Sequence, residues 1–116
     1  MIPGCTLYYR NKPGLLIRTK YSEDYFPVIN LSRGGVKFLC NERLKPGQDV
    51  VIKINIPGES QHPEINANIK WVSKNTEQSY RYQTGVAFNA YGNGKNENPE
   101  DILVFLKTLE QRENNI

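Results

Sequence analysis

Short apolar segments separated by turn-forming residues recur along most of this chain and are the strongest constraint on its fold. Turn-forming groups such as Pro13-Gly14, Lys45-Pro46-Gly47 and Pro57-Gly58 interrupt the apolar segments at short intervals. Regular interruptions of this kind are typical of an all-β barrel or sandwich, because proline and glycine end regular elements. We expect strands at residues 15–21, 25–31, 35–41, 49–56, 64–74 and 79–90.

The predicted strand at residues 49–56 alternates between apolar and polar side chains. Val50, Ile52 and Ile54 share one face of this strand, and Lys53 lies on the other. Successive side chains of a strand point to opposite faces, so one face packs against a core and the other meets water. Parallel strands that are buried on both sides would instead form continuous apolar runs. The pattern therefore predicts a mainly β fold with antiparallel strands.

The end of the chain changes period and predicts one helix at about residues 99–113. Asn98 is a favourable N-cap residue, and Pro99 suits the first helical position. We expect the apolar stripe of this helix to close or cover the β fold, and a surface offered to a partner is the alternative. The stripe has i, i+3, i+4, i+7 spacing and consists of Ile102, Phe105, Leu106 and Leu109.

A polar turn with two glycines separates the strands predicted at 25–31 and 35–41. It reads Asn30-Leu31-Ser32-Arg33-Gly34-Gly35. Glycine permits positive φ, so the backbone N–H groups of Gly34 and Gly35 can converge on an anion. An ordinary hairpin turn is the alternative, since Asn, Ser and Gly are common turn residues.

Asn30, Ser32 and Gly35 form an Asn-x-Ser-x-x-Gly motif, which resembles the Asp/Asn-x-Ser-x-x-Gly signature of the PilZ domain family. A Gly-Val-Ala-Phe segment at residues 85–88, a tryptophan late in the chain and the terminal helix are also similar to PilZ domains. The resemblance implies a receptor for the bacterial second messenger cyclic di-GMP that signals through a protein partner. It implies no catalytic activity and no cofactor.

The resemblance covers nearly the whole chain and also implies an architecture. We expect a single PilZ-like domain over residues 1–116, because a chain of 116 residues is too short to divide into several domains. Within it, we expect a six-stranded antiparallel β-barrel at about residues 15–90, followed by the C-terminal helix.

The motif and its neighbours provide a set of candidate ligand-binding residues. Family members that bind the dinucleotide carry an Arg-x-x-x-Arg pair shortly before the first barrel strand. Arg10 matches one member of this pair, but the positions four residues away are Thr6 and Gly14. Loss of one arginine contact, about 1.5–3 kcal/mol, predicts affinity weaker by about one to two orders of magnitude. The candidate residues are Arg10, Asn30, Ser32, Arg33, Gly34, Gly35 and Trp71.

Two of these candidates have alternative interpretations. Trp71 occupies a position where PilZ domains often place a bulky side chain near the purine, but it shares strand parity with the apolar Ile69. Strict alternation would turn Trp71 into the core, and a β-bulge would turn it to the surface. Arg33 is a candidate to replace part of the missing arginine pair, as are Arg18 and Lys20.

Two other functions stay open besides the receptor. A divergent PilZ domain that binds no nucleotide could act as a protein-interaction adaptor in motility, pilus or envelope functions. A nucleic-acid binder could use the chain's seven Tyr, four Phe and one Trp for stacking. Residues 1–58 hold nine Lys/Arg and four Asp/Glu, a net charge of +5, but the whole chain carries only +3. We expect no nucleic-acid partner, because so small a charge provides few phosphate contacts.

Several classes of site lack the residues that they need. His62 is the only histidine and has no plausible triad around it, so we expect no enzyme activity. Cys5 and Cys40 are far apart in sequence and predict neither a zinc site nor a disulfide framework. No apolar run approaches the ~18–20 residues that cross a bilayer, and the N-terminus lacks a secretory signal pattern. We therefore expect a cytoplasmic protein with no membrane insertion.

Overall fold

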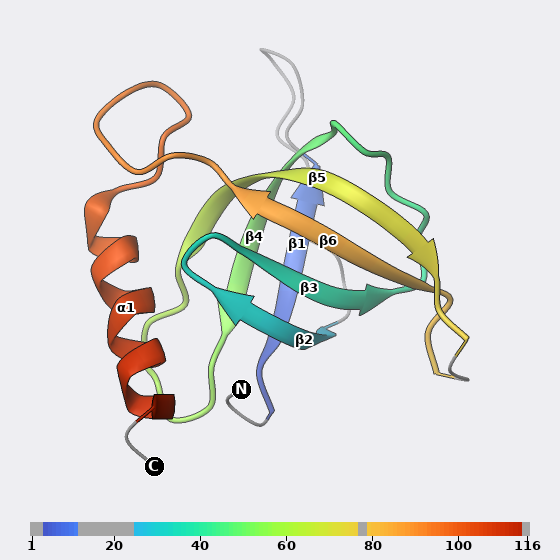
Figure 1. Ribbon diagram of the computed structural model, residues 1–116, viewed down its shortest axis with the longest axis horizontal. Coiled ribbons are helices and arrows are strands. Elements are labelled where there is room, and N and C mark those ends of the chain that lie inside the picture. Colours follow the sequence, from blue (N-terminus) through green and yellow to red (C-terminus); the bar gives the residue numbers. More distant parts are fainter. Residues whose placement is uncertain (1–3, 12–24, 77–78, 115–116) are drawn as a thin grey trace.

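The computed structural model describes residues 4–11, 25–76 and 79–114 and shows a closed β-barrel with one helix (Figure 1). All neighbouring strands pair antiparallel, in the order β1-β2-β3-β6-β5-β4 around the barrel. The predicted six-stranded antiparallel barrel with one C-terminal helix is confirmed. The elements are β1 (Thr6–Asn11), β2 (Phe26–Ser32), β3 (Gly35–Cys40), β4 (Asp49–Asn55), β5 (Glu64–Lys74), β6 (Tyr82–Phe88) and α1 (Glu100–Asn114).

The first strand begins earlier in the chain than residue 15, where we expected the barrel to start. β1 begins at Thr6 and pairs with β4 along its whole length. Leu7 and Tyr9 are buried, so β1 has the alternation of a strand with one packed face. This alternation spans only six residues, and the segment at 15–21 has a more apolar start, which is why the sequence favours a strand there. Residues 15–21 lie outside the described residues.

The interior of the barrel is filled by apolar side chains from all six strands. On β4, Val50, Ile52 and Ile54 are buried as predicted and Lys53 is partly buried, but Val51 is buried as well. Removal of such a side chain from water contributes about 1.5–3 kcal/mol. Cys5 and Cys40 are also buried, and neither is part of a disulfide. The fully buried core side chains include Leu7, Phe38, Val50, Ile52, Ile54, Ile65 and Ile69.

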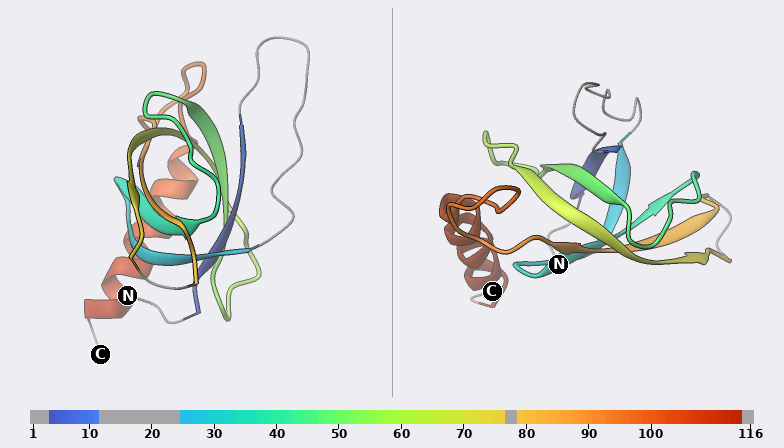
Figure 2. Two further views of the ribbon diagram at one scale, coloured as in Figure 1. Left: turned by 90° about the vertical axis from the view of Figure 1, so that its right-hand side faces the viewer. Right: turned by 90° about the horizontal axis from the view of Figure 1, so that it is seen from above.

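Helix α1 covers one end of the barrel. Figure 2 (left) shows the strands as a ring, with the helix lying behind it. Leu106 and Leu109 are buried in the core, and Ile102 and Phe105 pack partly against it. The prediction that this stripe closes the β fold is confirmed, and the stripe is not available as a partner surface.

Asn98 does not cap the helix, contrary to the prediction, because its side chain is used by the barrel. It is fully buried, and the Oδ1 atom accepts a hydrogen bond from the backbone N–H of Asn66 in β5 at 2.7 Å. Its Nδ2 group donates to the carbonyl oxygens of Asn66 and Asn89 at 3.0 Å each. The carboxamide thus pairs with a strand as a peptide group would, and it fixes the start of α1 to the sheet.

We predict that Asn98→Ala lowers the free energy of unfolding by about 2–3 kcal/mol, because it removes the three hydrogen bonds of a fully buried carboxamide. Urea unfolding followed by circular dichroism measures this loss. Asn93→Ala, at an exposed position seven residues before the helix start, is the control and should change stability by less than about 0.5 kcal/mol. Equal stability of the two variants would contradict the structural role of Asn98.

Candidate functional site

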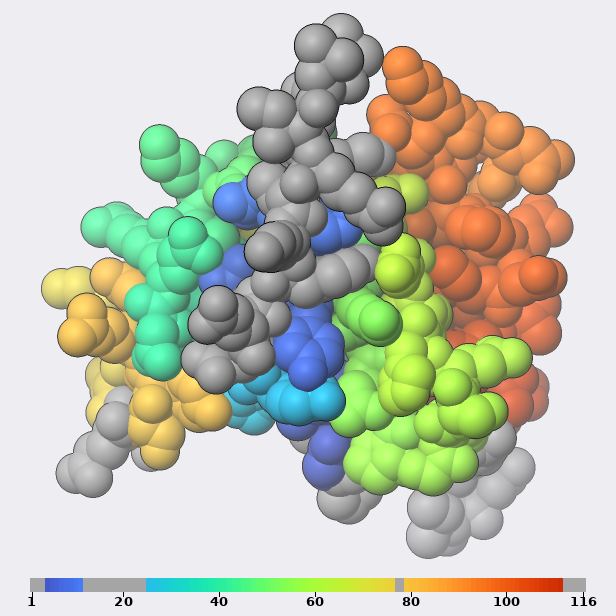
Figure 3. Space-filling view, turned by 180° about the vertical axis from the view of Figure 1, so that it is seen from behind, coloured from blue at the N-terminus to red at the C-terminus, as the bar shows by residue number. Residues whose placement is uncertain are grey.

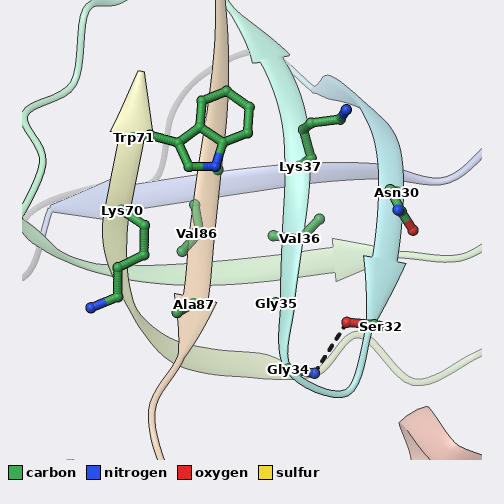
Figure 4. A pocket seen from close by; sticks show the side chains of 11 residues that line it. Asn30, Ser32, Gly34, Gly35, Val36, Lys37, Lys70, Trp71, Val86 and Ala87 are labelled. Carbon is green, nitrogen blue, oxygen red and sulfur yellow. Dashed lines mark hydrogen bonds between the residues drawn. The ribbon is translucent and has the colours of Figure 1, made fainter. Parts of the chain in front are cut away.

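A groove of about 260 Å³ lies on the outer face of β2, β3, β6 and β5, and we refer to it as the outer groove. Figure 4 shows its lining side chains. Most of the predicted ligand-binding residues lie in it, whereas Arg10 and Arg33 do not. The residues that line the outer groove are Asn30, Ser32, Gly34, Gly35, Val36, Lys37, Lys70, Trp71, Gly85, Val86 and Ala87.

A β-bulge in β2 turns the motif residues Asn30 and Ser32 outward. The register of β2 against β3 shifts between Val28 and Asn30. Val28 is buried in the barrel, so strict alternation would also have placed Asn30 inside. The extra residue at Ile29 reverses the parity, so that Asn30 and Ser32 are exposed while Leu31 packs against the core.

A second bulge, in β5, does the same for Trp71. The register of β5 against β6 shifts between Ile69, which lies opposite Val86, and Trp71, which lies opposite Gly85. The bulge at Lys70 places Lys70 and Trp71 on the same outer face. Trp71 is 41% exposed, so of the two positions predicted for it, the surface position is the one found.

The two bulges align residues from four strands in one row across the outer groove. Asn30 in β2 lies opposite Lys37 in β3, and Lys37 lies opposite Gly85 in β6. Trp71 in β5 completes the row at the far side of Gly85. The row therefore carries a carboxamide, an ammonium group and an indole, with a glycine between the last two.

The indole of Trp71 lies directly on Gly85 (Figure 4). A Cβ atom at position 85 would overlap with Cε2 and Nε1 of the indole, so the ring can lie there only because residue 85 is glycine. The same holds for Gly35, where a Cβ atom would overlap with the carbonyl oxygen of Val86. Both glycines thus permit close approach within the groove floor.

The glycine turn does not form the predicted nest of N–H groups. Among the described residues, the glycines with positive φ are Gly4, Gly47 and Gly58, so neither glycine of the turn adopts that conformation. The N–H of Gly34 instead donates to Oγ of Ser32 at 3.2 Å (Figure 4). Since Oγ accepts this bond, the hydroxyl hydrogen of Ser32 is free to donate to another acceptor.

Arg33 points to the helix side of the turn. Its backbone N–H donates to Oε1 of Glu110 in α1 at 3.0 Å, and its guanidinium Nε lies 3.9 Å from Oε2 of the same carboxylate. Its carbonyl oxygen accepts a hydrogen bond from the hydroxyl of Tyr91 at 2.7 Å. Partial burial raises the pKa of Tyr91, and the charge of Glu110 raises it further, so this hydroxyl stays protonated and donates.

Arg10 lies far from the outer groove. Thr6 is opposite Pro27, so Arg10 lies four residues to one side of this pair and Asn30 lies three residues to the other. At about 3.3 Å per residue, the two are separated by about 23 Å along the strands. Figure 3 shows the opposite side of the barrel, with β1 in blue beside β4 in green. The structure therefore does not bring Arg10 and Asn30 together.

Comparison with protein-family models gives a match to the PilZ domain over residues 8–103. The chain belongs to the PilZ domain family. Neither the search of curated proteins nor the search of solved structures found a match. The PilZ match includes every strand from β2 to β6 and the start of α1.

Two cations of the PilZ domain's groove were missed by the sequence analysis. Lys37 and Lys70 both line it, and the described lining residues include no acidic side chain. Lys37 could have been found, because it shares strand parity with the motif residue Gly35. Lys70 could not, since its outward position beside Trp71 depends on the bulge.

The described part of the PilZ domain contains no group of three or more His, Cys, Asp or Glu side chains that could hold a metal ion. Within the same residues, no helix is long and apolar enough to cross a membrane. The outer groove, with its two lysines and one indole, suits a ligand with negative charge and a flat ring.

We predict that Gly85→Ala displaces the indole from the groove floor and shifts the tryptophan emission to longer wavelength. Trp71 is the only tryptophan, so fluorescence reports on this ring alone. Gly34→Ala is the control, because its Cβ would meet only Oγ of Ser32 at an ordinary 3.8 Å. Unchanged emission in a folded Gly85→Ala protein would show that the ring does not rest on Gly85.

Proposed function

We propose that this PilZ domain is a cytoplasmic receptor that binds cyclic di-GMP in the outer groove and signals through a protein partner. The observation that supports this proposal best is the row from Asn30 to Trp71, which joins the family motif to an aromatic ring across four strands. In this proposal the domain is a binding module rather than an enzyme.

The phosphates of the ligand would be bound by Lys37, Lys70 and the hydroxyl of Ser32. Cyclic di-GMP carries two phosphates, and the groove carries two ammonium groups on strands that flank its floor. The hydroxyl of Ser32 has a hydrogen left to donate, because its oxygen already accepts from Gly34. Hydrogen bonds to charged groups contribute about 1.5–3 kcal/mol when they are shielded from water, and the contacts of these lysines contribute less because water reaches both side chains.

One guanine of the ligand would stack on Trp71. One face of the indole rests on Gly85, and the side chain remains 41% exposed. A ring held in this way has lost most of its freedom before the ligand arrives, so little further entropy is lost on binding. Stacking of a base on an aromatic side chain contributes about 1–3 kcal/mol.

The lysines replace only part of what an arginine pair provides. An ammonium group is a point charge, whereas a guanidinium binds two phosphate oxygens at once and can stack on a base. Lys37 is partly exposed and Lys70 is exposed, so salt screens their contacts. We therefore expect weaker and more salt-dependent binding than an arginine pair would give.

A second candidate function is that of a protein-interaction adaptor without nucleotide binding. Two observations favour it: Arg10 lies on β1 away from the outer groove, and Arg33 contacts Glu110 instead of the groove. A flat calorimetric titration with cyclic di-GMP, from a folded and monodisperse sample, would support the adaptor and contradict the receptor.

We predict that Trp71→Ala weakens cyclic di-GMP binding about 5- to 150-fold, which corresponds to the loss of one stacked base. Isothermal titration calorimetry at low salt measures the change. Tyr25→Ala is the control, because it removes an aromatic ring that is 52% exposed and lies outside the groove. If both variants bind as tightly as the wild type, the indole has no role in the site.

We also predict that Lys37→Gln and Lys70→Gln each weaken binding about two- to fivefold, as expected for partly screened charge pairs. The effect should shrink as the salt concentration is raised. Lys74→Gln removes the same charge from β5 outside the groove and should bind like the wild type. Equal losses for Lys70→Gln and Lys74→Gln would indicate a diffuse charge effect instead of a specific contact.

A further inference from the structure

The β2–β3 turn already binds an anion, and that anion is a side chain of the protein itself. Glu110 accepts the backbone N–H of Arg33 at 3.0 Å and lies 3.9 Å from its guanidinium Nε. Glu110 lies in the last third of α1, whereas Arg33 is flanked by the two groove residues Ser32 and Gly34. The turn is thus shared between the outer groove on one side and the helix on the other.

We infer that Glu110 competes with the ligand phosphate for Arg33, so that binding of cyclic di-GMP separates Glu110, and the end of α1 beyond the buried Leu109, from the β2–β3 turn. This inference rests on the proposed function and adds the means by which occupancy of the groove changes the rest of the domain. It assigns Arg33 to the ligand in the bound state and to Glu110 in the free state.

The Arg33–Glu110 contact has the properties of an exchangeable pair. The Arg33 side chain is 54% exposed and that of Glu110 is 33% exposed, and their closest side-chain atoms are 3.9 Å apart. Exposed pairs at this distance are weak, because water and salt screen them. A phosphate that a guanidinium grips with two hydrogen bonds is a stronger partner than this carboxylate.

Tyr91 keeps the backbone of the β2–β3 turn in place when the Arg33 side chain exchanges Glu110 for a phosphate. Its hydroxyl donates to the carbonyl oxygen of Arg33 at 2.7 Å, and Tyr91 does not belong to the helix. This bond does not compete with a phosphate, since it uses the carbonyl group and not the N–H or guanidinium. The turn therefore keeps its place on the barrel while the Arg33 side chain changes partner.

Competition of this kind is reciprocal. If the ligand weakens the contact between the turn and α1 by a given factor, then anything that separates Glu110 from the turn tightens ligand binding by the same factor. A partner that holds the end of α1 away from the barrel would raise the affinity for cyclic di-GMP. The reverse also holds, and the ligand would promote binding of that partner.

The test is a titration of the whole chain with cyclic di-GMP, for the wild type, Glu110→Gln, Arg33→Ala and the double variant. Glu110→Gln keeps an acceptor for the N–H of Arg33 but removes the charge, and it should bind about 1.4- to 5-fold more tightly than the wild type. In the Arg33→Ala background the same change should have a smaller effect, because the guanidinium is gone and only the backbone N–H of residue 33 still contacts residue 110. Glu100→Gln, at the start of the same helix, is the charge-matched control and should bind like the wild type.

Hydrogen exchange provides the second measurement. Ligand should speed the exchange of amides at residues 110–114 in the wild type and leave residues 66 and 98 protected. Tighter binding by Glu110→Gln together with faster exchange supports the inference. Unchanged affinity or unchanged exchange, in a wild-type protein that binds the ligand, overturns it and leaves the receptor function intact. Absence of binding in every variant overturns both.

Discussion

Two β-bulges, at Ile29 and Lys70, determine which side chains of this barrel face outward, and the outer groove depends on both. The shift at Ile29 exposes Asn30 and Ser32 while it turns Leu31 toward the core. The shift at Lys70 exposes Trp71 in the same way. Since the side-chain period of a strand is two, loss of either extra residue would exchange polar and apolar positions on one side of the groove. Packing of the core and assembly of the site are therefore a single requirement.

The strands and the helix were largely predictable, because their alternation follows directly from which side chains must be buried. The outward orientation of Asn30 and Trp71 could not be predicted, because one inserted residue reverses the alternation of a strand and leaves no strong signal in the local sequence. The glycines of the motif were interpreted through φ, but the structure uses Gly35 for close approach to Val86. Asn98 is a residue type that commonly caps helices, but its carboxamide forms hydrogen bonds with β5 instead. Local propensity fails at these positions because long-range packing decides them.

The basic groups of the outer groove differ in placement from an arginine pair ahead of the first strand. Lys37 and Lys70 project from paired strands, so the barrel holds their backbones in place before any ligand arrives. The indole is likewise held by contact with Gly85. In the proposed receptor, little entropy would be lost on binding because these groups are already held in place, but the lysines would not make the bidentate contacts of guanidinium groups. Its selectivity would rest on the spacing between the stacking ring and the two ammonium groups.

The buried carboxamide of Asn98 also determines what kind of motion the helix can make. It attaches the chain just before α1 to β5 and to Asn89. Glu110 contacts the β2–β3 turn twelve residues further on, about 18 Å along the chain at 1.5 Å per residue. Leu106 and Leu109 are buried in the core between these two contacts. Separation of Glu110 from its turn would therefore free only the part of α1 beyond Leu109, and a partner would meet a short frayed helix end instead of a displaced helix.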